Sequence, residues 1–496
     1  MGIRIYNTMA RRKEDFVPFR HGKVGMYCCG PTVYDYFHIG NARAFVVPDM
    51  VRKYLQFRGY EVTYVQNITD IEDKIIKRAN ERGVTPSQIV DQYVKAFYDD
   101  RAALGVGAPD HQPKATEHVP EIVEMVRGLV ESGHAYESGG DVYFDVSSFQ
   151  GYGKLSGQNP DDLKAGARVE LSEQKDDPLD FVLWKATKPG EPSWPSPWGP
   201  GRPGWHIECS VMSAGYLGGL VDIHLGGSDL IFPHHENEIA QSESLSDGEF
   251  VKYWMHNAMV NVDGERMGKS MGNFFTVRDI LKKYEGKVVR YYLVASHYRQ
   301  PISFGVEELD MCGKALARLE DAVSNAMSAY GIPADEVEAT ADQLTSAASI
   351  SEASNTLEKA AASTLASFTE YMDDDFNTSG AMSSLHELAR AINGFISSSA
   401  RADAERKAVS FGVASLWKMG TILGFMDKET LNAAKPSLKG GDEATDGLMR
   451  LIISIRAAAR AKKDWATSDA IRDGLKELGI TVEDTADGAR WKIERR

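Results

Sequence analysis

The sequence predicts an α/β protein: a parallel-sheet domain with a connective insertion comes first, and a helical bundle and a small mixed α/β domain follow. Three observations lead to this prediction. Residues 1–110 alternate strand-like runs with helical ones, and residues 201–265 resume that rhythm. Residues 321–430 are rich in Ala, Ser, Glu and Leu at a helical period. Alternating strands and helices are typical of a parallel sheet, whose ligand crevice lies at the carboxyl ends of its strands.

The composition indicates an ordinary globular protein and excludes several classes. The 496 residues are 43% hydrophobic and 26% charged, and so long a chain should form about three or four domains. The N-terminal stretch lacks the apolar centre of a signal peptide and no run is long enough to span a membrane, so we expect a cytoplasmic protein without membrane contact. Four cysteines are too few for a disulfide framework. Because the chain has a net charge of -15, an RNA partner would have to bind at a local group of cations. Residues 450–496, in which Lys and Arg slightly outnumber Asp and Glu, are such a group.

Residues 1–110 are predicted to form the first half of a Rossmann-type domain. VGMYCCG and YEVTYVQNI have the pattern of strands. Helical patterns cover 42–57, 70–82 and 86–104. Between the first strand and the first helix, MYCCGPTVYDYFHIGNAR puts Gly30 and Pro31 in a turn and His38 at the helix start. A helix N-terminus after a glycine turn favours a bound phosphate, although a lone histidine there is more often a cap or a core residue.

Residues 111–200 interrupt the rhythm and are predicted to be the connective insertion. EHVPEIVEMVRGLVESGHAY has an amphipathic helical period, DVYFDV is strand-like, and KPGEPSWPSPWGPGRPG predicts an irregular loop. Residues 201–265 then supply the second half of the sheet domain. Residues 266–320 begin with the glycine-rich, cationic RMGKSMGN, which suits a mobile loop that closes on a polyphosphate. The alternative for this loop is a solvated surface turn.

Two further domains are predicted toward the end of the chain. Residues 321–430 should form the helical bundle. A polar linker with glycines, AAKPSLKGGDEATDG, then leads to a small domain over 445–496. There we expect helices at 448–463 and 465–478, followed by two short strands in ITVED and ARWKIE.

GWHIECS and FPHHENE hold candidate metal ligands. His234 and Glu238 are four residues apart, so on a helix they share a face. With thiolates from Cys29 and Cys209 they would complete a Cys₂HisGlu set that suits tetrahedral Zn²⁺. A polar helix start with its acids on the positive end of the dipole explains HHENE without a metal, so both interpretations stay open. A zincin motif is excluded, because Ile239 stands where HExxH needs its second histidine.

HIGN followed far downstream by RMGKS resembles the paired signatures of the class I aminoacyl-tRNA synthetases, usually HIGH and KMSKS. Other stretches narrow the resemblance to the cysteinyl-tRNA synthetases: YCCGPTVYDYFHIGNAR, NITDIEDKIIKRA, DFVLWK, PSWPSPWGPGRPGWHIECS, GGSDLIFPHHENEIAQS and GNFFTVRDIL. The resemblance covers essentially the whole chain. It implies a cysteine–tRNA ligase that joins L-cysteine to tRNA(Cys) with ATP through a cysteinyl-adenylate. It also implies a monomer with one Zn²⁺ per chain, which selects the cysteine thiolate over serine, and Mg²⁺ bound with ATP.

The family motifs imply a role for each matching residue. The catalytic residues would be His38, Asn41 and Lys269. ATP would be bound by His38, Gly40, Asn41, Arg266, Met267, Gly268, Lys269 and Ser270. Cysteine would contact Gly30, Thr32, Trp205, His224 and Asp229, and the zinc ligands would be Cys29, Cys209, His234 and Glu238. The anticodon would be read by Arg460, Trp465, Asp469 and Asp484.

The RMGKS loop departs from the family pattern at two positions. Arg266 keeps the first charge in a different geometry, and Gly268 removes a hydroxyl and adds flexibility. Lys269 is retained, so we assign the main catalytic effect of the loop to it. For the aromatic residues of the cysteine pocket the alternative is core packing, and for the anticodon residues it is a helix salt bridge and a core tryptophan.

Three alternative functions fit parts of the sequence. A mycothiol-pathway ligase shares the zinc site and the adenylation chemistry, but it lacks the anticodon-reading end that this chain keeps. A non-catalytic RNA-binding or regulatory paralogue would not need both motifs and all four metal ligands intact. A Rossmann dehydrogenase would need GxGxxG at its first helix, and the sequence has none there.

Overall fold

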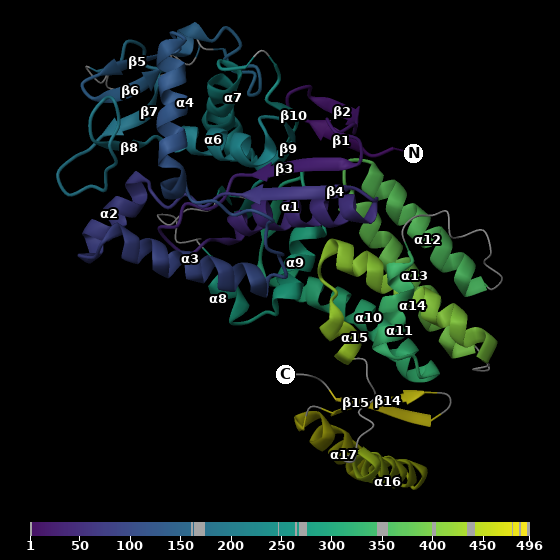
Figure 1. The fold of residues 1–496 in the computed structure, drawn as a ribbon. Helices are drawn as coiled ribbons and strands as arrows, with labels where there is room; N and C mark the ends of the chain where they lie inside the picture. Colours follow the sequence, from purple (N-terminus) through teal and green to yellow (C-terminus); the bar gives the residue numbers. More distant parts are fainter. Residues whose placement is uncertain are drawn as a thin grey trace. The chain divides into compact units, whose positions relative to one another are not determined.

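The computed structural model describes residues 2–159, 162, 174–246, 248–262, 265–266, 275–344, 356–398, 403–433, 442–478, 480–485 and 488–493. The chain divides into two compact units, Met1–Ala434 and Lys435–Arg496 (Figure 1). The large unit contains the sheet domain, its insertion and the helical bundle. Within the described ranges no helix is both long enough and apolar enough to cross a membrane.

A four-stranded parallel sheet carries the first part of the large unit. Its strands are β3 (Lys23–Cys28), β4 (Glu61–Gln66), β9 (Val221–Gly227) and β10 (Val251–Asn257), in the order β10-β9-β3-β4. Each strand is parallel to its neighbours, and Tyr27 is paired with His224 on one side. The predicted parallel α/β fold is therefore confirmed. All four carboxyl ends meet at one edge, so the residues that follow each strand are brought together.

Helix α1 (Ile39–Phe57) connects β3 to β4. Its buried face, which includes Phe45 and Met50, belongs to the main hydrophobic core. His38 and Asn41 close a capping box at the helix start: His38 Nδ1 accepts from the Asn41 N–H (3.3 Å), and Asn41 Oδ1 accepts from the His38 N–H (3.4 Å). The helix therefore begins directly after the HIGN histidine.

Helices α2 (Asp73–Arg82) and α3 (Pro86–Ala103) follow β4 and pack against each other. The side chains of Glu72 and Thr85 cap them by accepting hydrogen bonds from backbone N–H groups. Gly83 ends α2 with a φ of 65°, in the left-handed region that favours glycine. The first of these helices begins later than its sequence pattern predicts, because Glu72 is its cap.

The insertion is an antiparallel sheet packed on a helix. Strands β5 (Ala135–Ser138), β6 (Asp141–Phe144), β7 (Phe181–Ala186) and β8 (Gly201–Pro203) pair in that order, and α4 (Val119–Glu131) packs against them. The prediction of an irregular loop over KPGEPSWPSPWGPGRPG is wrong at its end, because β8 pairs with β7 there. β8 tolerates a proline because it is an edge strand, where some N–H groups need no partner.

Shorter elements complete the first part of the large unit. Before the bundle they are β1 (Arg4–Asn7), β2 (Arg12–Asp15), η1 (Ala115–His118), η2 (Val146–Ser148), α6 (Trp205–Leu217), η3 (Ser228–Leu230), η4 (Ile231–His235) and α7 (Glu236–Glu243). A small sheet and two helices follow the main sheet: β11 (Val260–Val262), β12 (Glu265–Arg266), α8 (Val277–Leu281), α9 (Gly286–Val294) and β13 (Ile302–Phe304).

The bundle consists of α10 (Val306–Tyr330), α11 (Ala334–Asp342), α12 (Thr356–Asp373), α13 (Thr378–Ser398), α14 (Asp403–Leu423) and α15 (Lys428–Ala433). The predicted boundary between 320 and 321 falls inside α10. A buried arginine ties the bundle to the sheet domain: Arg290 of α9 donates to the Leu423 carbonyl (2.8 Å), the Gly105 carbonyl (2.8 Å) and Asp49 Oδ2 (2.5 Å). Helix α1, which carries Asp49, is therefore held by the end of α14.

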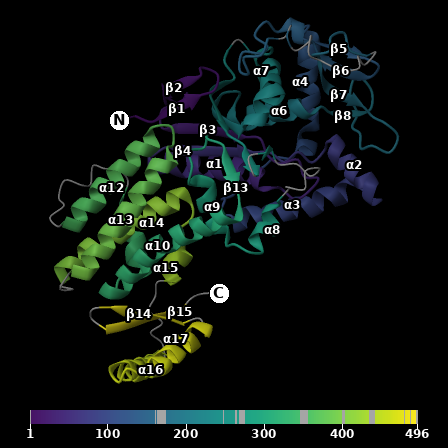
Figure 2. The same ribbon diagram turned by 180° about the vertical axis from the view of Figure 1, so that it is seen from behind.

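The small unit contains two helices and an antiparallel strand pair (Figure 2). They are α16 (Asp442–Ala461), α17 (Trp465–Glu477), β14 (Ile480–Thr485) and β15 (Gly488–Ile493). The predicted order of two helices and two short strands agrees with these elements. Asp464 caps α17 by accepting from the Thr467 N–H (3.1 Å).

Candidate active site and metal centre

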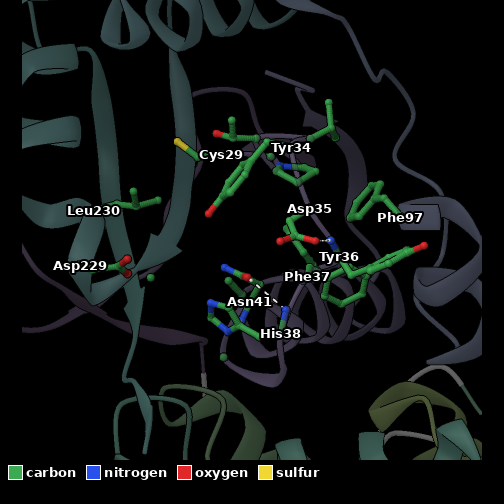
Figure 3. Close-up of a pocket in the computed structure, with 18 of the residues that line it drawn as sticks. Cys29, Tyr34, Asp35, Tyr36, Phe37, His38, Asn41, Phe97, Asp229 and Leu230 are labelled. Atoms are coloured by element: carbon green, nitrogen blue, oxygen red, sulfur yellow. Dashed lines mark hydrogen bonds between the residues drawn. The ribbon is translucent and has the colours of Figure 1, made fainter. Parts of the chain in front are cut away.

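A cavity of about 300 Å³ lies at the carboxyl edge of the parallel sheet (Figure 3). Its lining comes from segments 29–41, 227–230 and 257–260, which lie at and beyond the carboxyl ends of β3, β9 and β10. Trp205 at the start of α6 and several residues of α2 and α3 complete it. The cavity therefore combines residues that the sequence predicts for ATP with residues that it predicts for cysteine.

His38, Gly40 and Asn41 line the cavity at the N-terminus of α1. His38 is a helix cap, as the alternative interpretation of this histidine expected, and it also borders the cavity. A Cβ at position 40 would lie 2.9 Å from the His38 ring, so a side chain there would displace the ring. The first turn of α1 thus places the positive end of a helix and two polar side chains beside the cavity, which is an arrangement suited to phosphate.

The residues that follow the RMGKS stretch are anchored beside this helix start. The Ile39 N–H donates to the Phe275 carbonyl (3.2 Å), and His38 forms an isolated backbone bridge with Thr276. For Arg266 the structure gives the backbone, in β12. The predicted ATP residues that lie outside the described residues are Met267, Gly268, Lys269 and Ser270.

The four predicted metal ligands come from separate elements and meet at the cavity wall. Cys29 follows β3, Cys209 is in α6, His234 is in η4 and Glu238 is in α7. Their donor atoms all lie within 4.8 Å of one another, and all four residues are buried. Cys29 Sγ is 3.7 Å from Cys209 Sγ, and His234 Nε2 is 3.1 Å from Glu238 Oε1. Zn²⁺ bonds of about 2.0–2.3 Å in a tetrahedron separate the donors by about 3.3–3.8 Å. The two sulfur atoms lie at such a distance and His234 and Glu238 are slightly closer, so small shifts of the side chains would let this set hold zinc.

A second buried donor set shares Cys29 and Glu238 and adds His224 and His235. His224 Nε2 lies 2.9 Å from Glu238 Oε2, and His235 Nε2 lies 3.3 Å from Cys29 Sγ. In this arrangement the two histidines orient the carboxylate and the thiol of the first set. Outer contacts of this kind fix the geometry of metal ligands.

Trp205 and His206 hold the ring of His234 in a similar way. The Trp205 and His234 rings are 4.4 Å apart, and His206 Nδ1 lies 2.9 Å from His234 Nδ1. This contact occupies one nitrogen of His234 and leaves Nε2 directed at Glu238. Because Trp205 also lines the cavity, it connects the metal ligands to the predicted cysteine pocket.

The charges of the donor set stabilise one another. The hydrogen bond from the Cys29 thiol lowers the pKa of Cys209 to about 6, although burial opposes it. Burial also opposes ionisation of Glu238, but His224 and His234 bring the pKa of Glu238 down to about 2. Burial disfavours a charged His234, yet Cys209 and Glu238 raise the pKa of His234 to about 10. The two anionic donors therefore attract positive charge to this point.

Four of the five predicted cysteine-binding residues line the cavity: Gly30, Thr32, Trp205 and Asp229. A Cβ at position 30 would lie 1.6 Å from the backbone oxygen of Asn67, so only glycine fits there. His224 is not among the described residues that line the cavity. It is fully buried, contacts Glu238 and stacks on Trp254 at 4.5 Å.

Three family models match consecutive parts of the chain. The tRNA synthetases class I (C) catalytic domain matches residues 15–314, the DALR domain matches 367–427, and the cysteinyl-tRNA ligase anticodon binding domain matches 451–491. The chain belongs to the cysteinyl-tRNA synthetases. It is 49% identical to the cysteine–tRNA ligase of Desulfitobacterium hafniense over 498 residues, which cover 100% of both chains. It is 50% identical to that of Heliobacterium modesticaldum over 497 residues, which cover 99% of this chain and 100% of the relative.

Membership in the cysteinyl-tRNA synthetases makes the chain a class I ligase that charges tRNA with cysteine, and it confirms the predicted family and enzyme class. A solved structure of Mycobacterium tuberculosis methionyl-tRNA synthetase in complex with methionyl-adenylate shares the fold. Its TM-score is 0.57 at 14% identity, and the match covers 81% of this chain and 90% of that one.

Sequence reasoning missed a buried polar chain behind the cavity of this cysteinyl-tRNA synthetase. Asn67 Oδ1 accepts from the Gly30 N–H (2.7 Å), Asn67 Nδ2 donates to Thr69 Oγ1 (3.3 Å), and Thr69 Oγ1 donates to Glu208 Oε2 (2.9 Å). Burial and the neighbouring Cys209 hold the pKa of Glu208 well above its usual range. Asn67 and Thr69 lie within three residues of the end of β4, and that position after a parallel strand is the signal that could have identified them.

The predicted anticodon residues of this cysteinyl-tRNA synthetase all lie in the small unit. Trp465 begins α17 and is 56% exposed, so core packing does not explain it. Asp469 forms an ion pair with Arg472 on the same helix (3.2 Å), as the salt-bridge alternative expected. Arg460 is exposed near the end of α16, and Asp484 is in β14.

Proposed function

We propose that the cavity joins L-cysteine to tRNA(Cys) in two steps. The cysteine carboxylate attacks the α-phosphorus of ATP to form a cysteinyl-adenylate and pyrophosphate. A terminal ribose hydroxyl of the tRNA then attacks the carbonyl carbon of the adenylate, which forms the ester and releases AMP. The observation that carries this proposal is that one cavity holds the start of α1 and a wall with four metal donors within 4.8 Å. Neither step needs a nucleophilic side chain, so the protein contributes positioning and charge stabilisation.

Cys29, Cys209, His234 and Glu238 would hold one Zn²⁺ per chain. When bound, Zn²⁺ supplies a strong preference for a thiolate, because it lowers the pKa of a thiol whereas an alcohol stays protonated. Cysteine and serine differ in a single atom, and the size of the cavity alone would discriminate between them by about 1–3 kcal/mol. The preference of the metal for a thiolate would add to this difference and exclude serine. This ligand set is favoured over the set with His224 and His235 because it offers two cysteine sulfurs instead of one.

The ATP site would consist of the start of α1 and the RMGKS loop. His38 and Asn41 would hold the phosphates, and Gly40 would leave room for the adenine. The loop would close over ATP and its Mg²⁺, with Lys269 neutralising the pyrophosphate. The remaining loop residues in this role are Arg266, Met267, Gly268 and Ser270. The backbone bridge between His38 and Thr276 supports this assignment, because it anchors one end of the loop at the site.

Cysteine would lie between the metal ligands and the nucleotide. Gly30 and Thr32 would contact its backbone, Trp205 would form a wall of its pocket, and Asp229 would approach its ammonium group or the adenylate ribose. His224 would act through Glu238, as a positioning residue, since it contacts that ligand at 2.9 Å.

The small unit would read the anticodon. The exposed indole of Trp465 would stack on an unpaired base, and Arg460, Asp469 and Asp484 would bond to base edges. An exposed aromatic residue beside charged side chains is the composition that single-stranded RNA recognition uses.

The test is charging of bulk tRNA by the purified chain with ATP and labelled cysteine, run beside labelled serine, with the zinc content measured on the same sample. We expect charging with cysteine alone and about one zinc per chain. Cysteine-dependent pyrophosphate exchange without charging would contradict the tRNA assignment and point to another acceptor, an amino sugar first. Equal charging with serine would contradict selection by the metal.

A further inference from the structure

The cavity has a third part, which contains none of the residues assigned above to ATP or to cysteine. We call it the aromatic arm, and it is lined by Tyr34, Tyr36, Lys74, Tyr93 and Phe97. The two tyrosines at 34 and 36 precede the HIGN motif, the lysine is in α2, and the other two rings are in α3. Figure 3 shows Tyr36 and Phe97 across the cavity from Asp229 and Leu230. The arm is therefore continuous with the proposed cysteine and ATP sites but has a different chemical character.

The rings of the arm are held in fixed orientations. Tyr36 packs edge-on against the buried Tyr93 with the ring centroids 5.1 Å apart. The guanidinium of Arg278 lies 4.8 Å from the centre of the Tyr36 ring, and Lys74 Nζ lies 5.6 Å from the centre of the Tyr34 ring. Tyr34 and Tyr36 are only half-buried. They are therefore rigid aromatic surfaces that a ligand in the cavity can reach.

The arm presents one exposed cation, Lys74, beside its aromatic rings. Its acids are already paired, since Arg78 donates to Asp35 (2.6 Å) and Arg278 donates to Asp100 (3.0 Å). Lys74 is exposed and makes no ion pair with any residue that the structure describes. An exposed lysine beside aromatic rings suits a single phosphate group of a nucleic acid strand at this place.

We propose that the aromatic arm binds the unpaired 3′ end of the tRNA, with a base stacked on Tyr34 or Tyr36 and a phosphate beside Lys74. This inference rests on the proposed function. Stacking platforms next to cations are the general means of holding single-stranded RNA. The terminal ribose must enter the cavity that Cys29 lines in order to reach the activated cysteine. The bases that precede this ribose in the RNA need a binding surface elsewhere in the cavity, so that they do not occupy the position of the cysteine. The arm adjoins the cysteine and nucleotide positions and meets both needs.

The test compares the affinity of the full chain for intact tRNA(Cys) and for the same tRNA without its three terminal nucleotides. We expect the wild type to prefer intact tRNA by about fivefold or more, the usual minimum for one stacked base. Tyr34→Ala and Lys74→Ala should each reduce this ratio toward one, whereas Tyr34→Phe, which keeps the ring, should retain it. A general loss of folding would weaken the binding of both RNAs alike and would leave the ratio of the two affinities unchanged.

Matched controls come from the same helices. Tyr98→Ala removes a ring of α3 that is 37% exposed and does not line the cavity, and Lys77→Ala removes an exposed cation of α2, so both should keep the wild-type ratio. An unchanged ratio in Tyr34→Ala and Lys74→Ala proteins that keep the wild-type affinity for the truncated tRNA would overturn the proposal. A rise in the KM for ATP in pyrophosphate exchange, larger than the loss in the ratio, would also overturn it and assign the arm to ATP. A wild-type chain that exchanges pyrophosphate but charges no tRNA contradicts the proposed function itself, before any variant is made.

Discussion

The metal donors and the anticodon residues are two polar regions built in opposite ways. In the large unit Cys209, His234 and Glu238 are 2%, 1% and 0% exposed, and the donor atoms of the ligand set lie within 4.8 Å of one another. In the small unit Trp465 is 56% exposed, and Asp469 has its ion pair on the surface of α17. In the first region the polar groups contact one another, and in the second they are exposed to solvent.

The difference follows from what each region has to distinguish. Buried polar groups interact strongly, and a buried polar group without a partner lowers the free energy of unfolding. Such groups are therefore held in one geometry by their partners. Such a geometry suits a site that must separate a thiol from a hydroxyl. An unpaired base is recognised by stacking and by its edges, which requires exposed side chains. Changes in the buried region should therefore affect metal content and activity together, and changes in the exposed region should affect tRNA binding alone.

The largest effect should come from Cys209→Ser. Changes around metal ligands typically cost about 10- to 100-fold in metal affinity, so the loss of a ligand should exceed about 100-fold. Zinc content and cysteine-dependent pyrophosphate exchange should fall together. The control is Cys312→Ser in α10, a free cysteine far from the donor set in sequence, which should keep both. Full exchange activity in a zinc-free Cys209→Ser protein would contradict the role of the buried region.

A second variant, His224→Phe, separates two roles of one buried histidine. It keeps a ring against Trp254 but removes the 2.9 Å contact with Glu238. If His224 orients the ligand, the affinity for zinc should fall by about 10- to 100-fold, measured with a competing chelator. His224→Gln, which keeps a donor, should lose less. A raised KM for cysteine with unchanged zinc affinity would instead support the pocket-wall role that the family resemblance implies.

In the exposed region, Trp465→Ala should weaken tRNA binding by about tenfold, within the range for the loss of one stacked base. The pyrophosphate exchange rate should not change, because this step needs no tRNA. Leu478→Ala is a matched control, since Leu478 is a 75% exposed apolar residue directly after α17. Unchanged tRNA affinity in Trp465→Ala would remove the stacking role and with it the contrast between the two regions.

The smallest expected effect concerns pH. Burial, with Arg318 and Arg390, lowers the pKa of His386 below its ordinary value of about 6.5. The folded protein therefore favours the neutral ring, so the contribution of His386 to stability is complete above about pH 6.5 and is lost as the pH falls below it. Between pH 7.5 and 5.5 the Tm of His386→Gln should fall by about 1 °C less than that of the wild type.

The exposed His21 provides the control for this measurement, since His21→Gln should leave the pH dependence of Tm as in the wild type. An identical pH dependence in His386→Gln would show that this half-buried polar group behaves like an exposed one. The contrast between the buried and the exposed regions would then be limited to the metal donors.

Much of the fold could be predicted from local patterns. The strand, turn and helix around His38, and the two helices and two strands of the small unit, each depend on residues that are close in sequence. Hydrophobic period, helix caps and glycine turns act over such short distances. The antiparallel sheet of the insertion was only partly predicted, because β6 and β7 are far apart in the chain and their pairing leaves no local signal.

The sequence by itself determined the chemistry that is available: the HIGN and RMGKS motifs, the His234 and Glu238 spacing, and, through the family resemblance, the complete ligand set. The tertiary structure alone decided which groups meet. It brought Cys29 within 3.7 Å of Cys209, placed His224 behind the cavity wall and joined Asn67 to Gly30. The physical reason is that a parallel sheet gathers its strand ends at one edge, so residues far apart in sequence become neighbours there.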